Sequence, residues 1–557
     1  FHLVCDATNP EAIDRLRERK HREEKPFALM MASIKGIKKV CEVSSLEERL
    51  LKSPESPIVL LKRKASPTGI FSLQHRKIAP ENPWLGIMLP YTPLHHLLMR
   101  ELSVPIVATS GNISEEPMCI DENQALRTLG GIADVFLIHN RPIVRHVDDS
   151  IARIIMGREM ILRRARGYAP LPVQLNSQPD ESSHNLTPSL AVGGHLKNTI
   201  AIAKGNSVFI SQHIGDLSTQ ESLNTFERVI QDFQRLYRIE PEHYVIDMHP
   251  DYLSGKYARS HFDDVRAVQH HEAHIAACRA ENQVSGKALG VSWDGTGFGR
   301  DETIWGGEFF ISDEKNHKRI AHFRNFPLPG SDEAIREPRR SALGILYEIF
   351  GSGIFDHNSY IREHFSDKEI LFLRQMLAKG YNSPRTSSVG RLFDAVAALL
   401  NVRQKIAYEG QAAMMLEFLV DENEGESYQV SLEGKEPLIV NWEVMIRQIL
   451  TDVESGLKKN RIAARFHTTL ANVILAVART VNLEKVVLSG GCFQNTILLE
   501  KTIRLLQKHQ FHPYWHQRIP PNDGGISLGQ TVLGRDTGAP ENAPGGRYNF
   551  ADLKMNQ

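Results

Sequence analysis

The sequence predicts a mixed α/β protein in which an N-terminal α/β domain precedes a larger, two-lobed domain. Three observations lead to this prediction. The chain has 557 residues, which is too many for one core and typical of about two to four domains. Short apolar runs of strand length alternate with helical patterns. Two hairpins with glycine-bearing turns precede a strand that ends in Gly490-Gly491 and leads into a helix.

The composition limits the class of protein. Apolar residues make up 41% and charged residues 24% of the chain, as in soluble globular proteins. Lys+Arg and Asp+Glu both number 66, so no charge excess points to nucleic acid. No apolar run approaches the roughly 18 residues that span a membrane, and the five cysteines form no CxxC pair. We therefore expect a cytoplasmic protein with neither nucleic acid nor membrane as a partner.

The first domain is expected at residues 1–175. Asn9 followed by Pro10 is typical of a helix start, because a capping residue precedes Pro at the first helical position. The apolar runs at 56–64 and 104–112 end in turn residues and predict buried strands.

Two segments lack the patterns of a packed domain. Residues 176–188 are polar, contain two prolines and predict a linker. Residues 536–557 are rich in Pro and Gly and predict a flexible tail. The second domain is therefore expected at 189–535.

The second domain is expected to contain two β-hairpins with glycine-bearing turns. Residues 198–213 predict a hairpin, residues 287–312 predict a second hairpin with a longer glycine-rich connection, and residues 330–480 are largely helical. Glycine turns let backbone N–H groups approach phosphates, and a helix start adds a favourable field for anions. This order is typical of the actin, sugar-kinase and heat-shock-ATPase superfamily, whose two lobes clamp ATP. The three expected turns are at 193–199, 294–299 and 489–495.

The segment 267–277, AVQHHEAHIAA, predicts a helix, because it is rich in Ala and contains no Gly or Pro. His270 and His274 are four residues apart and would share a face, as a pair of metal ligands does. Asp294 ends an apolar strand and Asp523 precedes an apolar helix, so both can point into a cleft. The four could hold a divalent cation close to the ATP phosphates. The alternatives are surface histidines and capping aspartates.

The N-terminal domain contains a second set of polar candidates. Residues 19–30 supply Arg19, Lys20, Arg22 and Lys25, and residues 108–117 place hydroxyls, Gly and Asn after a strand. Arg163, Arg164 and Arg166 follow later. A pocket with these side chains could hold a triphosphate and stabilise charge at the α-phosphorus during adenylation of a carboxylate. The alternative is a solvated, basic helix face.

Several motifs resemble known families. The motifs KHREEKPFALM, LPYTPLHHLL, TSGNISEEP and RRARGYAP resemble the YrdC-type domain. The motifs VGGHLKNTIA, QHHEAHIAA, DGTGFG, YEGQAA, LSGGCFQN and NDGGISLGQ resemble the TsaD-type carbamoyl-transfer domain. The two domains in this order, over about residues 1–535, resemble the HypF family of carbamoyltransferases in the maturation of nickel–iron hydrogenase.

The resemblance implies a reaction. Carbamate released from carbamoyl phosphate would be adenylated with ATP in the first domain, with loss of pyrophosphate. The carbamoyl group would then pass, in the second domain, to the C-terminal cysteine thiolate of a HypE-like partner, which makes the cyanide precursor. A divalent metal would take part: Mg with ATP, and Fe or Zn at the His/Asp site.

The resemblance also assigns residues. Lys20, Arg22, Lys25, Ser110 and Asn112 would line the adenylation pocket. His270, His274, Asp294 and Asp523 would hold the metal. The nucleotide contacts in the second domain would be Gly194, Lys197, Asn198, Glu409, Gly410, Gly490, Gly491 and Asn495.

The sequence departs from the family pattern in one respect. Relatives begin with an acylphosphatase-like domain and a cysteine-rich zinc-finger segment, and neither pattern is found here, so we expect the chain to be an N-terminally truncated form. Two alternatives stay open: a tRNA threonylcarbamoylation enzyme and a non-enzymatic, ATP-switched binding protein. The order of domains argues against O-carbamoyltransferases, and the histidine pair argues against a plain ATPase switch.

Overall fold

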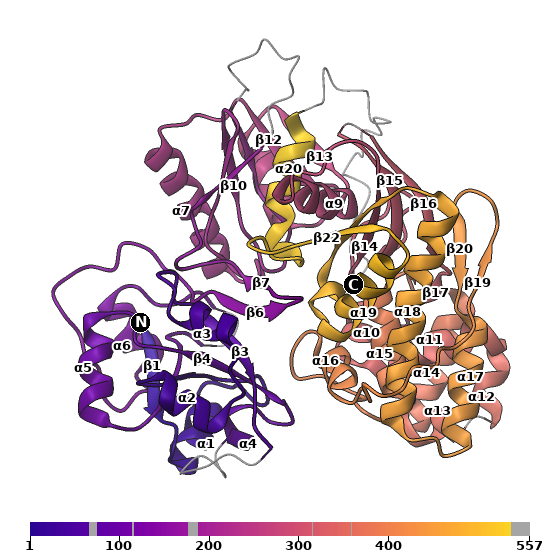
Figure 1. Ribbon diagram of the computed structural model, residues 1–557, viewed down its shortest axis with the longest axis horizontal. Coiled ribbons are helices and arrows are strands. Elements are labelled where there is room, and N and C mark those ends of the chain that lie inside the picture. Colours follow the sequence, from indigo (N-terminus) through magenta and orange to yellow (C-terminus); the bar gives the residue numbers. More distant parts are fainter. Residues whose placement is uncertain (66–74, 114–115, 176–187, 315, 358, 536–557) are drawn as a thin grey trace.

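The computed structural model describes residues 1–65, 75–113, 116–175, 188–314, 316–357 and 359–535. The expected tail, and the expected linker apart from Pro188, lie outside these ranges. Figure 1 shows three bodies, namely an N-terminal domain at the lower left and two lobes above it and to its right. The predicted order of an α/β domain followed by a two-lobed domain is confirmed.

The N-terminal domain is built on a seven-stranded mixed sheet in the order β1-β5-β2-β4-β3-β6-β7. The two predicted strands are β3 and β5. The strands are β1 (His2–Asp6), β2 (Ala28–Met30), β3 (Ile58–Lys62), β4 (Trp84–Met88), β5 (Ile106–Ser110), β6 (Ile151–Ile155) and β7 (Arg158–Arg163). The helices are α1 (Pro10–Arg19), α2 (Ile34–Val40), α3 (Ser45–Leu51), α4 (His75–Ile78), α5 (Pro93–Leu102) and α6 (Glu122–Leu129).

Helix α1 begins as the sequence predicts. The Asn9 side chain accepts hydrogen bonds from the backbone N–H groups of Glu11 and Ala12, and Pro10 is the first helical residue. Its apolar side chains Ile13 and Leu16 are buried against the sheet domain's core. Arg17 of α1 and Lys20, which caps the end of α1, are thereby held in place. Lys20 lies at the end of strand β5, beside the predicted adenylation residues Ser110 and Asn112.

The first lobe has a six-stranded sheet in the order β13-β12-β9-β10-β11-β8. Strand β8 lies before residue 175, yet it pairs with β11 and so joins the sheet of the second domain. The strands are β8 (Pro172–Gln174), β9 (Ser189–Ala191), β10 (Ala201–Lys204), β11 (Ser207–Ile210), β12 (His243–Asp247) and β13 (Val265–Val268). The helices are α7 (Gln220–Tyr237), α8 (Leu253–His261), α9 (His270–Glu281) and α20 (Ile526–Arg535).

The second lobe has a seven-stranded sheet in the order β19-β20-β16-β15-β14-β21-β22 and a thick helical layer. Its strands are β14 (Ala288–Trp293), β15 (Gly307–Ser312), β16 (His317–Phe323), β19 (Ser431–Glu433), β20 (Leu438–Asn441), β21 (Lys485–Ser489) and β22 (His512–Trp515), with β17 (Phe326–Pro327) and β18 (Arg385–Thr386) apart. Its helices are α10 (Asp332–Arg336), α11 (Pro338–Phe350), α12 (Ile354–His357), α13 (Ser359–His364), α14 (Asp367–Lys379), α15 (Val389–Leu399), α16 (Gln411–Phe418), α17 (Glu443–Glu454), α18 (Lys459–Val481) and α19 (Thr496–Lys508). The 3₁₀ turns are η2 (Gly351–Gly353), η3 (Gly491–Gln494) and η4 (Asp523–Gly525).

Two predicted boundaries differ in the structure. Helix α9 begins at His270, three residues later than the predicted segment, because residues 265–268 pair with β12 as strand β13. The α-helix after Gly490-Gly491 begins only at Thr496, because the short turn η3 intervenes. The field of a helix start therefore does not act directly at the Gly-Gly pair.

Helix α20 packs closely on α9. A Cβ atom at Gly529 of α20 would lie 1.8 Å from the carbonyl oxygen of Ala273 in α9, so only glycine allows this approach. The turn η4 directly precedes α20. This packing therefore brings the segment that carries Asp523 to the helix that carries the two histidines.

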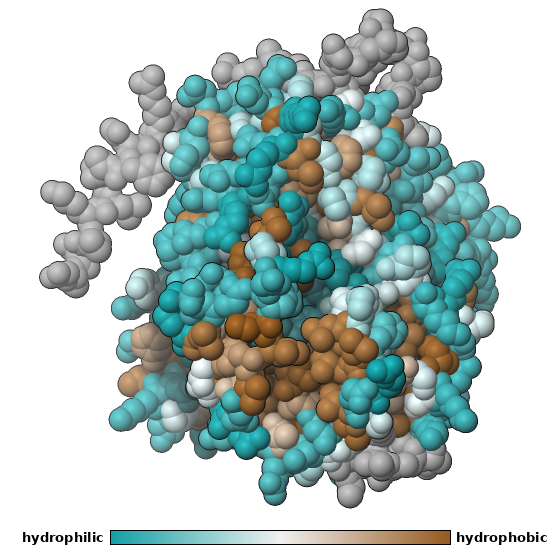
Figure 2. Space-filling view, turned by 90° about the vertical axis from the view of Figure 1, so that its left-hand side faces the viewer, coloured by the Kyte–Doolittle hydropathy of each residue, from teal (hydrophilic) through white to brown (hydrophobic). Residues whose placement is uncertain are grey.

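Two observations concern the apolar character of the molecule: its exposed hydrophobic side chains and its helices. Figure 2 shows hydrophobic side chains gathered on the lower part of one face, at the height of the N-terminal domain. Exposed apolar residues of the N-terminal domain include Leu94, Leu97, Val135 and Leu137. Within the described ranges, no helix combines the length and the apolar character that crossing a bilayer would require.

Candidate functional site

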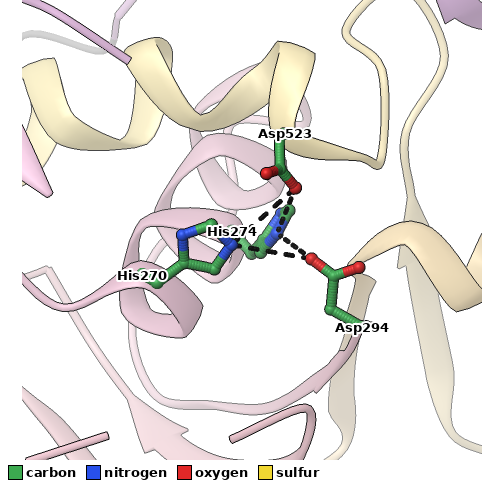
Figure 3. A group of neighbouring side chains, drawn as sticks. All are labelled: His270, His274, Asp294 and Asp523. Carbon is green, nitrogen blue, oxygen red and sulfur yellow. Dashed lines mark hydrogen bonds and ion pairs between the residues drawn. The ribbon is translucent and has the colours of Figure 1, made fainter. Parts of the chain in front are cut away.

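Four buried polar side chains meet between the two lobes. His270 and His274 extend from α9, Asp294 follows β14 of the second lobe, and Asp523 lies in η4 (Figure 3). One ligand atom from each residue lies within 4.8 Å of the others. The structure therefore brings together the four residues that the sequence nominates as metal ligands.

The distances suit a single cation. The Nε2 atom of His270 lies 3.6 Å from Asp294 Oδ2 and 3.8 Å from Asp523 Oδ1. The Nε2 atom of His274 lies 2.9 Å and 3.9 Å from the same two oxygens. Ligands held about 2.1 Å from a tetrahedral ion would be about 3.4 Å apart. The chemistry also fits, because two imidazoles and two carboxylates are ligands that Zn and Fe accept.

A fifth residue, Asp247 at the end of β12, orients the cluster. Its Oδ2 atom lies 2.7 Å from Nδ1 of His270, which is completely buried. In that hydrogen bond the protonated Nδ1 of His270 donates to Asp247, which leaves Nε2 facing the other three ligands. The Nε2 atom has no hydrogen-bond partner, as expected of an atom that is positioned for a ligand. The sequence analysis did not nominate Asp247.

The site carries an excess of negative charge. Burial and the neighbouring Asp294 carboxylate raise the pKa of Asp523 to about 8. Two carboxylates held this close in a buried site oppose each other's ionisation. A divalent cation would remove this conflict, since it would pair with both carboxylates and require neutral imidazoles.

The glycine loop at 294–299 packs directly on the histidines. A Cβ at Gly297 would lie 2.4 Å from Cε1 of His271 and 2.9 Å from Cδ2 of His270. The backbone N–H of Gly295 donates to Asp294 Oδ1 at 2.7 Å. The loop therefore fixes the Asp294 carboxylate and the histidine rings against each other.

The predicted nucleotide contacts of the first lobe surround Asp523. A Cβ at Gly194 would be 3.5 Å from Asp523 Oδ2, so this loop passes beside the metal cluster. The Nζ atom of Lys197 forms a very short ion pair with Glu409 of the second lobe. Asn198 is buried, and its Nδ2 donates to the carbonyls of Val192 and Gly194, so its amide shapes the loop.

The predicted contacts of the second lobe approach the cluster from the other side. The backbone N–H of Gly491 donates to Asp294 Oδ1 at 3.3 Å, and Gly490 has a φ of +98°. Gly410, with a φ of +74°, precedes helix α16. Asn495 caps helix α19 by accepting from the N–H of Leu498. Gly490 and Gly491 thus lie beside Asp294, whereas the Asn495 oxygen already caps its own helix.

The N-terminal pocket is organised by Lys20. Its Nζ atom donates to the carbonyl oxygens of Ser110 and Asn112 at 2.7 and 2.5 Å, and to Oδ1 of Asn112 at 2.6 Å. The Ser110 hydroxyl donates to the same Oδ1 at 2.6 Å. Lys20 therefore holds the loop that follows β5 in a fixed shape.

The remaining predicted cations divide into two groups. Lys25 has its closest charged neighbours in Arg22 and Arg163, and the surrounding protein together with these cations lowers the pKa of Lys25 to about 8. Arg164 instead donates to the carbonyls of Ile210 and Leu171. Arg166 pairs with Asp149. The guanidinium groups of Arg164 and Arg166 thus bond to the chain itself, and their place in the adenylation pocket stays a prediction.

A second buried network, which the sequence analysis did not nominate, supports the cluster. Nδ1 of His516 lies 2.9 Å from Glu281 at the end of α9, and Nε2 lies 2.8 Å from the hydroxyl of Ser489. Glu281 also accepts from the backbone N–H groups of residues 517–519. The network joins the histidine helix, the segment before Asp523 and the strand before Gly490.

Comparison with known families divides the chain in the same way. Residues 1–165 match the Sua5/YciO/YrdC family, described as "Telomere recombination". Residues 184–281 match the family described as "HypF Kae1-like domain". Residues 290–530 match "Carbamoyltransferase, Kae1-like Domain, second subdomain".

Individual relatives match nearly the whole chain. Carbamoyltransferase HypF of Synechocystis sp. is 45% identical in an alignment 551 residues long, which covers 96% of this chain and 70% of that protein. The crystal structure of full-length HypF in the phosphate- and nucleotide-bound form has a TM-score of 0.89 at 44% identity, covering 96% of this chain and 83% of that chain. The structure of T. kodakarensis HypF has a TM-score of 0.87 at 33% identity, covering 96% and 70%.

A YrdC-like domain followed by a two-lobed Kae1-like domain defines a class of carbamoyltransferases. Within this class, the chain belongs to the HypF family and is therefore an enzyme. The alternative of a non-enzymatic, ATP-switched binding protein is wrong, since the relatives are carbamoyltransferases.

Proposed function

We propose that this enzyme adenylates carbamate with ATP and transfers the carbamoyl group to the C-terminal cysteine thiolate of a HypE-like partner. Carbamoyl phosphate is the source of the carbamate, and the product serves the synthesis of the cyanide ligands of nickel–iron hydrogenase. The observation that carries the proposal is the buried cluster of His270, His274, Asp294 and Asp523 between glycine loops. The phosphate and nucleotide in the crystal structure of a HypF relative support nucleotide binding.

The first half-reaction belongs to the N-terminal pocket. A carbamate oxygen attacks the α-phosphorus of ATP. The bond between the α-phosphorus and the bridging oxygen breaks, and pyrophosphate leaves with its electron pair. Arg22 and Lys25, two neighbouring cations, would stabilise the charge on the α-phosphorus and on the leaving pyrophosphate. Lys20 holds Ser110 and Asn112 in the loop that would bind the nucleotide. No general base is needed, because the carbamate is already an anion.

The second half-reaction belongs to the cleft between the lobes. The partner's thiolate attacks the carbonyl carbon of the carbamoyl adenylate, and AMP leaves as its phosphate takes the bonding electron pair. The glycine loops at 193–199, 294–299 and 489–495 would cradle the phosphate through their N–H groups. When bound at the His/Asp cluster, a divalent cation would supply electrostatic stabilisation of the developing negative charge.

The proposal is tested by the nucleotide products. The enzyme, ATP and carbamoyl phosphate are combined, and adenine nucleotides and phosphates are separated. We expect AMP and pyrophosphate to appear only when carbamoyl phosphate is present. ADP and phosphate that form independently of carbamoyl phosphate would contradict the proposal.

Variants assign the two half-reactions to the two sites. Replacing Lys25 by Gln is expected to slow AMP formation. Replacing His270 or His274 by Ala is expected to lower bound metal and to abolish transfer to the thiol while AMP formation continues. Unchanged metal content in both histidine variants would show that the cluster is not a metal site.

The tRNA threonylcarbamoylation reaction is the second candidate for this pair of domains. Membership of the HypF family favours the thiol acceptor over tRNA. The two are distinguished by adding threonine and tRNA to the same assay. Labelled carbamoyl carbon is expected in the partner protein and not in tRNA.

A further inference from the structure

Glu24 of the N-terminal domain hydrogen-bonds to the second lobe, in addition to the packing of Ile155 and Met160 into that lobe's core. Glu24 lies in the loop 21–27, which follows α1 and carries the predicted adenylation residues Arg22 and Lys25. The Oε2 atom of Glu24 accepts from Nη2 of Arg403 at 2.5 Å and from Nε2 of Gln411 through a very short hydrogen bond. Both partners belong to the segment 403–411 of the second lobe.

The loop around Glu24 has a fixed shape on its own side. Arg17 of α1 donates from Nη1 to the carbonyl oxygens of residues 22, 23 and 25 at 3.0 to 3.2 Å. Arg22 donates from Nε to the carbonyl of Lys25 at 3.1 Å. Because its carbonyl oxygens are bound in this way, the loop has one backbone shape. A displacement of Glu24 would therefore displace Arg22 and Lys25 as well.

The partner segment is equally well defined. Gln411 is the first residue of α16, is buried, and accepts from the backbone N–H of Ala407 at 2.7 Å through its Oε1. Arg403 donates from Nε to the carbonyl of Lys405 at 2.8 Å. Between these anchors in the sequence lies Glu409, which pairs with Lys197 of the first lobe. The segment 403–411 therefore contacts both the loop that carries Arg22 and Lys25 and the first lobe.

The contact is only partly screened by solvent. The side chains of Arg403 and Glu24 are 23% and 33% exposed. Although partial burial opposes ionisation, the hydrogen bonds from Arg403 and Gln411 lower the pKa of Glu24, so the carboxylate is ionised at neutral pH. A charged pair with a second, neutral donor has more geometric specificity than an isolated surface pair.

We propose that Glu24 is a positioning residue that holds the adenylation loop against the segment 403–411, so that the carbamoyl adenylate formed in one domain is retained for transfer in the other. The inference rests on the proposed function, since it requires an adenylate made in the first domain and used in the second. When the contact is broken, the loop separates from the second lobe. The intermediate then escapes, and water attacks its carbonyl carbon, which releases AMP and carbamate.

The test measures how tightly the two half-reactions are coupled. Glu24→Ala and Arg403→Ala are each assayed with ATP, carbamoyl phosphate and the thiol-bearing partner, and AMP is counted against carbamoylated thiol. The unmodified enzyme is expected to give close to one AMP for each carbamoyl group transferred. Both variants are expected to raise this ratio by up to about fivefold, because a partly exposed ion pair changes a population by that factor at most.

Two further variants separate coupling from folding. Glu159→Ala removes another ion pair between the domains, Arg518 Nε to Glu159 Oε1 at 2.7 Å, which lies outside both loops, and is expected to leave the ratio unchanged. Glu24→Gln keeps the size and one acceptor oxygen and is expected to raise the ratio less than Glu24→Ala. The double variant Glu24→Ala with Arg403→Ala should match the single variants, since both remove one contact.

The outcomes separate this inference from the proposed function. A ratio in both alanine variants equal to that of the Glu159→Ala control would overturn the role of Glu24. Loss of AMP formation in Glu24→Ala, with unchanged thermal stability, would also overturn it, because Glu24 would then act within adenylation itself. If the unmodified enzyme forms no AMP from carbamoyl phosphate, the proposed function fails instead.

Discussion

Gly297 sets the distance between the loop 294–299 and the histidines of α9. A methyl group at this position would meet His271 at 2.4 Å and His270 at 2.9 Å, both of which are buried and unable to withdraw. We expect Gly297→Ala to displace the His270 ring and to lower the metal content of the purified protein by at least about tenfold. Metal analysis by mass spectrometry measures this directly.

Gly295 offers the matched control for that experiment. It lies in the same loop, but its added Cβ would come no closer than 3.4 Å to the end of the Arg391 side chain. Gly295→Ala should therefore retain its metal. Equal metal loss in both variants would mean that any stiffening of the loop, and not the contact with the histidines, disturbs the site.

Lys25 gives a pH dependence whose sign follows from its surroundings. The protein around it and the cations Arg22 and Arg163 lower its pKa to about 8, and a bound triphosphate favours its protonated form. Below pH 8 the ammonium is present and available to ATP. Above pH 8 it loses its proton, so the KM for ATP in AMP formation should rise, by up to about tenfold per pH unit.

The Lys25→Gln variant should remove this rise, since it cannot titrate, and should have a high KM at every pH. Lys35→Gln changes an exposed lysine of α2 and should keep the pH profile of the unmodified enzyme. A pH-independent KM between pH 7 and 9 in the unmodified enzyme would contradict the assignment of Lys25.

A sequence pattern can show that two residues lie on the same face of one helix or strand. It cannot show which residues from distant parts of the chain contact each other. The i,i+4 spacing of His270 and His274 was sufficient to nominate both, and the structure places them on one face of α9. Asp247 could not be found in this way, because it lies 23 residues before His270 and its role depends on how β12 stands beside α9. Asn198 shows a contact that the sequence could not reveal, since its Nδ2 donates to carbonyl oxygens of its own loop.

At the scale of elements, the same limit applies to boundaries. The predicted hairpin at 198–213 is confirmed as β10 and β11, because a Lys-Gly-Asn turn joins two apolar runs that pair antiparallel. The predicted helix from 267 is wrong at its start, because the β-branched Val265 and Val268 are drawn into the sheet beside β12. Tertiary pairing outweighs the helix propensity of Ala267.

Glu281 links three elements through one carboxylate. It ends α9, accepts from His516, and accepts from three successive N–H groups before Asp523. We expect Glu281→Ala to lower the free energy of unfolding by about 3 kcal/mol, because several buried donors would lose their acceptor. Denaturant unfolding measures the loss.

A second effect distinguishes this network from ordinary packing. Glu281 holds the backbone of residues 517–519, and Asp523 follows shortly after them. The variant should therefore also bind metal more weakly than the unmodified protein under native conditions. Glu484→Ala, which changes an exposed side chain beside β21, should alter neither property. Lower stability with unchanged metal affinity would show that Asp523 is held by other contacts.

At the scale of the whole molecule, the four candidate metal ligands come from both lobes. His270 and His274 come from α9, which packs on α20 and on β14 and β21 of the second lobe. Asp523 lies directly before α20, which packs on the first lobe's sheet, whereas Asp294 follows β14 of the second lobe (Figure 1). A cation bound by all four therefore connects the lobes, in addition to completing the site.

Connection of the lobes predicts a stability change on metal removal. A ligand at 100 times its dissociation constant stabilises the folded state by about 2.7 kcal/mol, so chelation should lower the Tm by a few degrees. His270→Ala, which lacks one ligand, should have a low Tm that chelation no longer changes. Calorimetry with and without chelator gives both values. A Tm that falls equally on chelation in the variant and in the unmodified protein would place the stabilising ion elsewhere, and the cleft between the lobes would then be held by protein contacts such as Lys197 with Glu409.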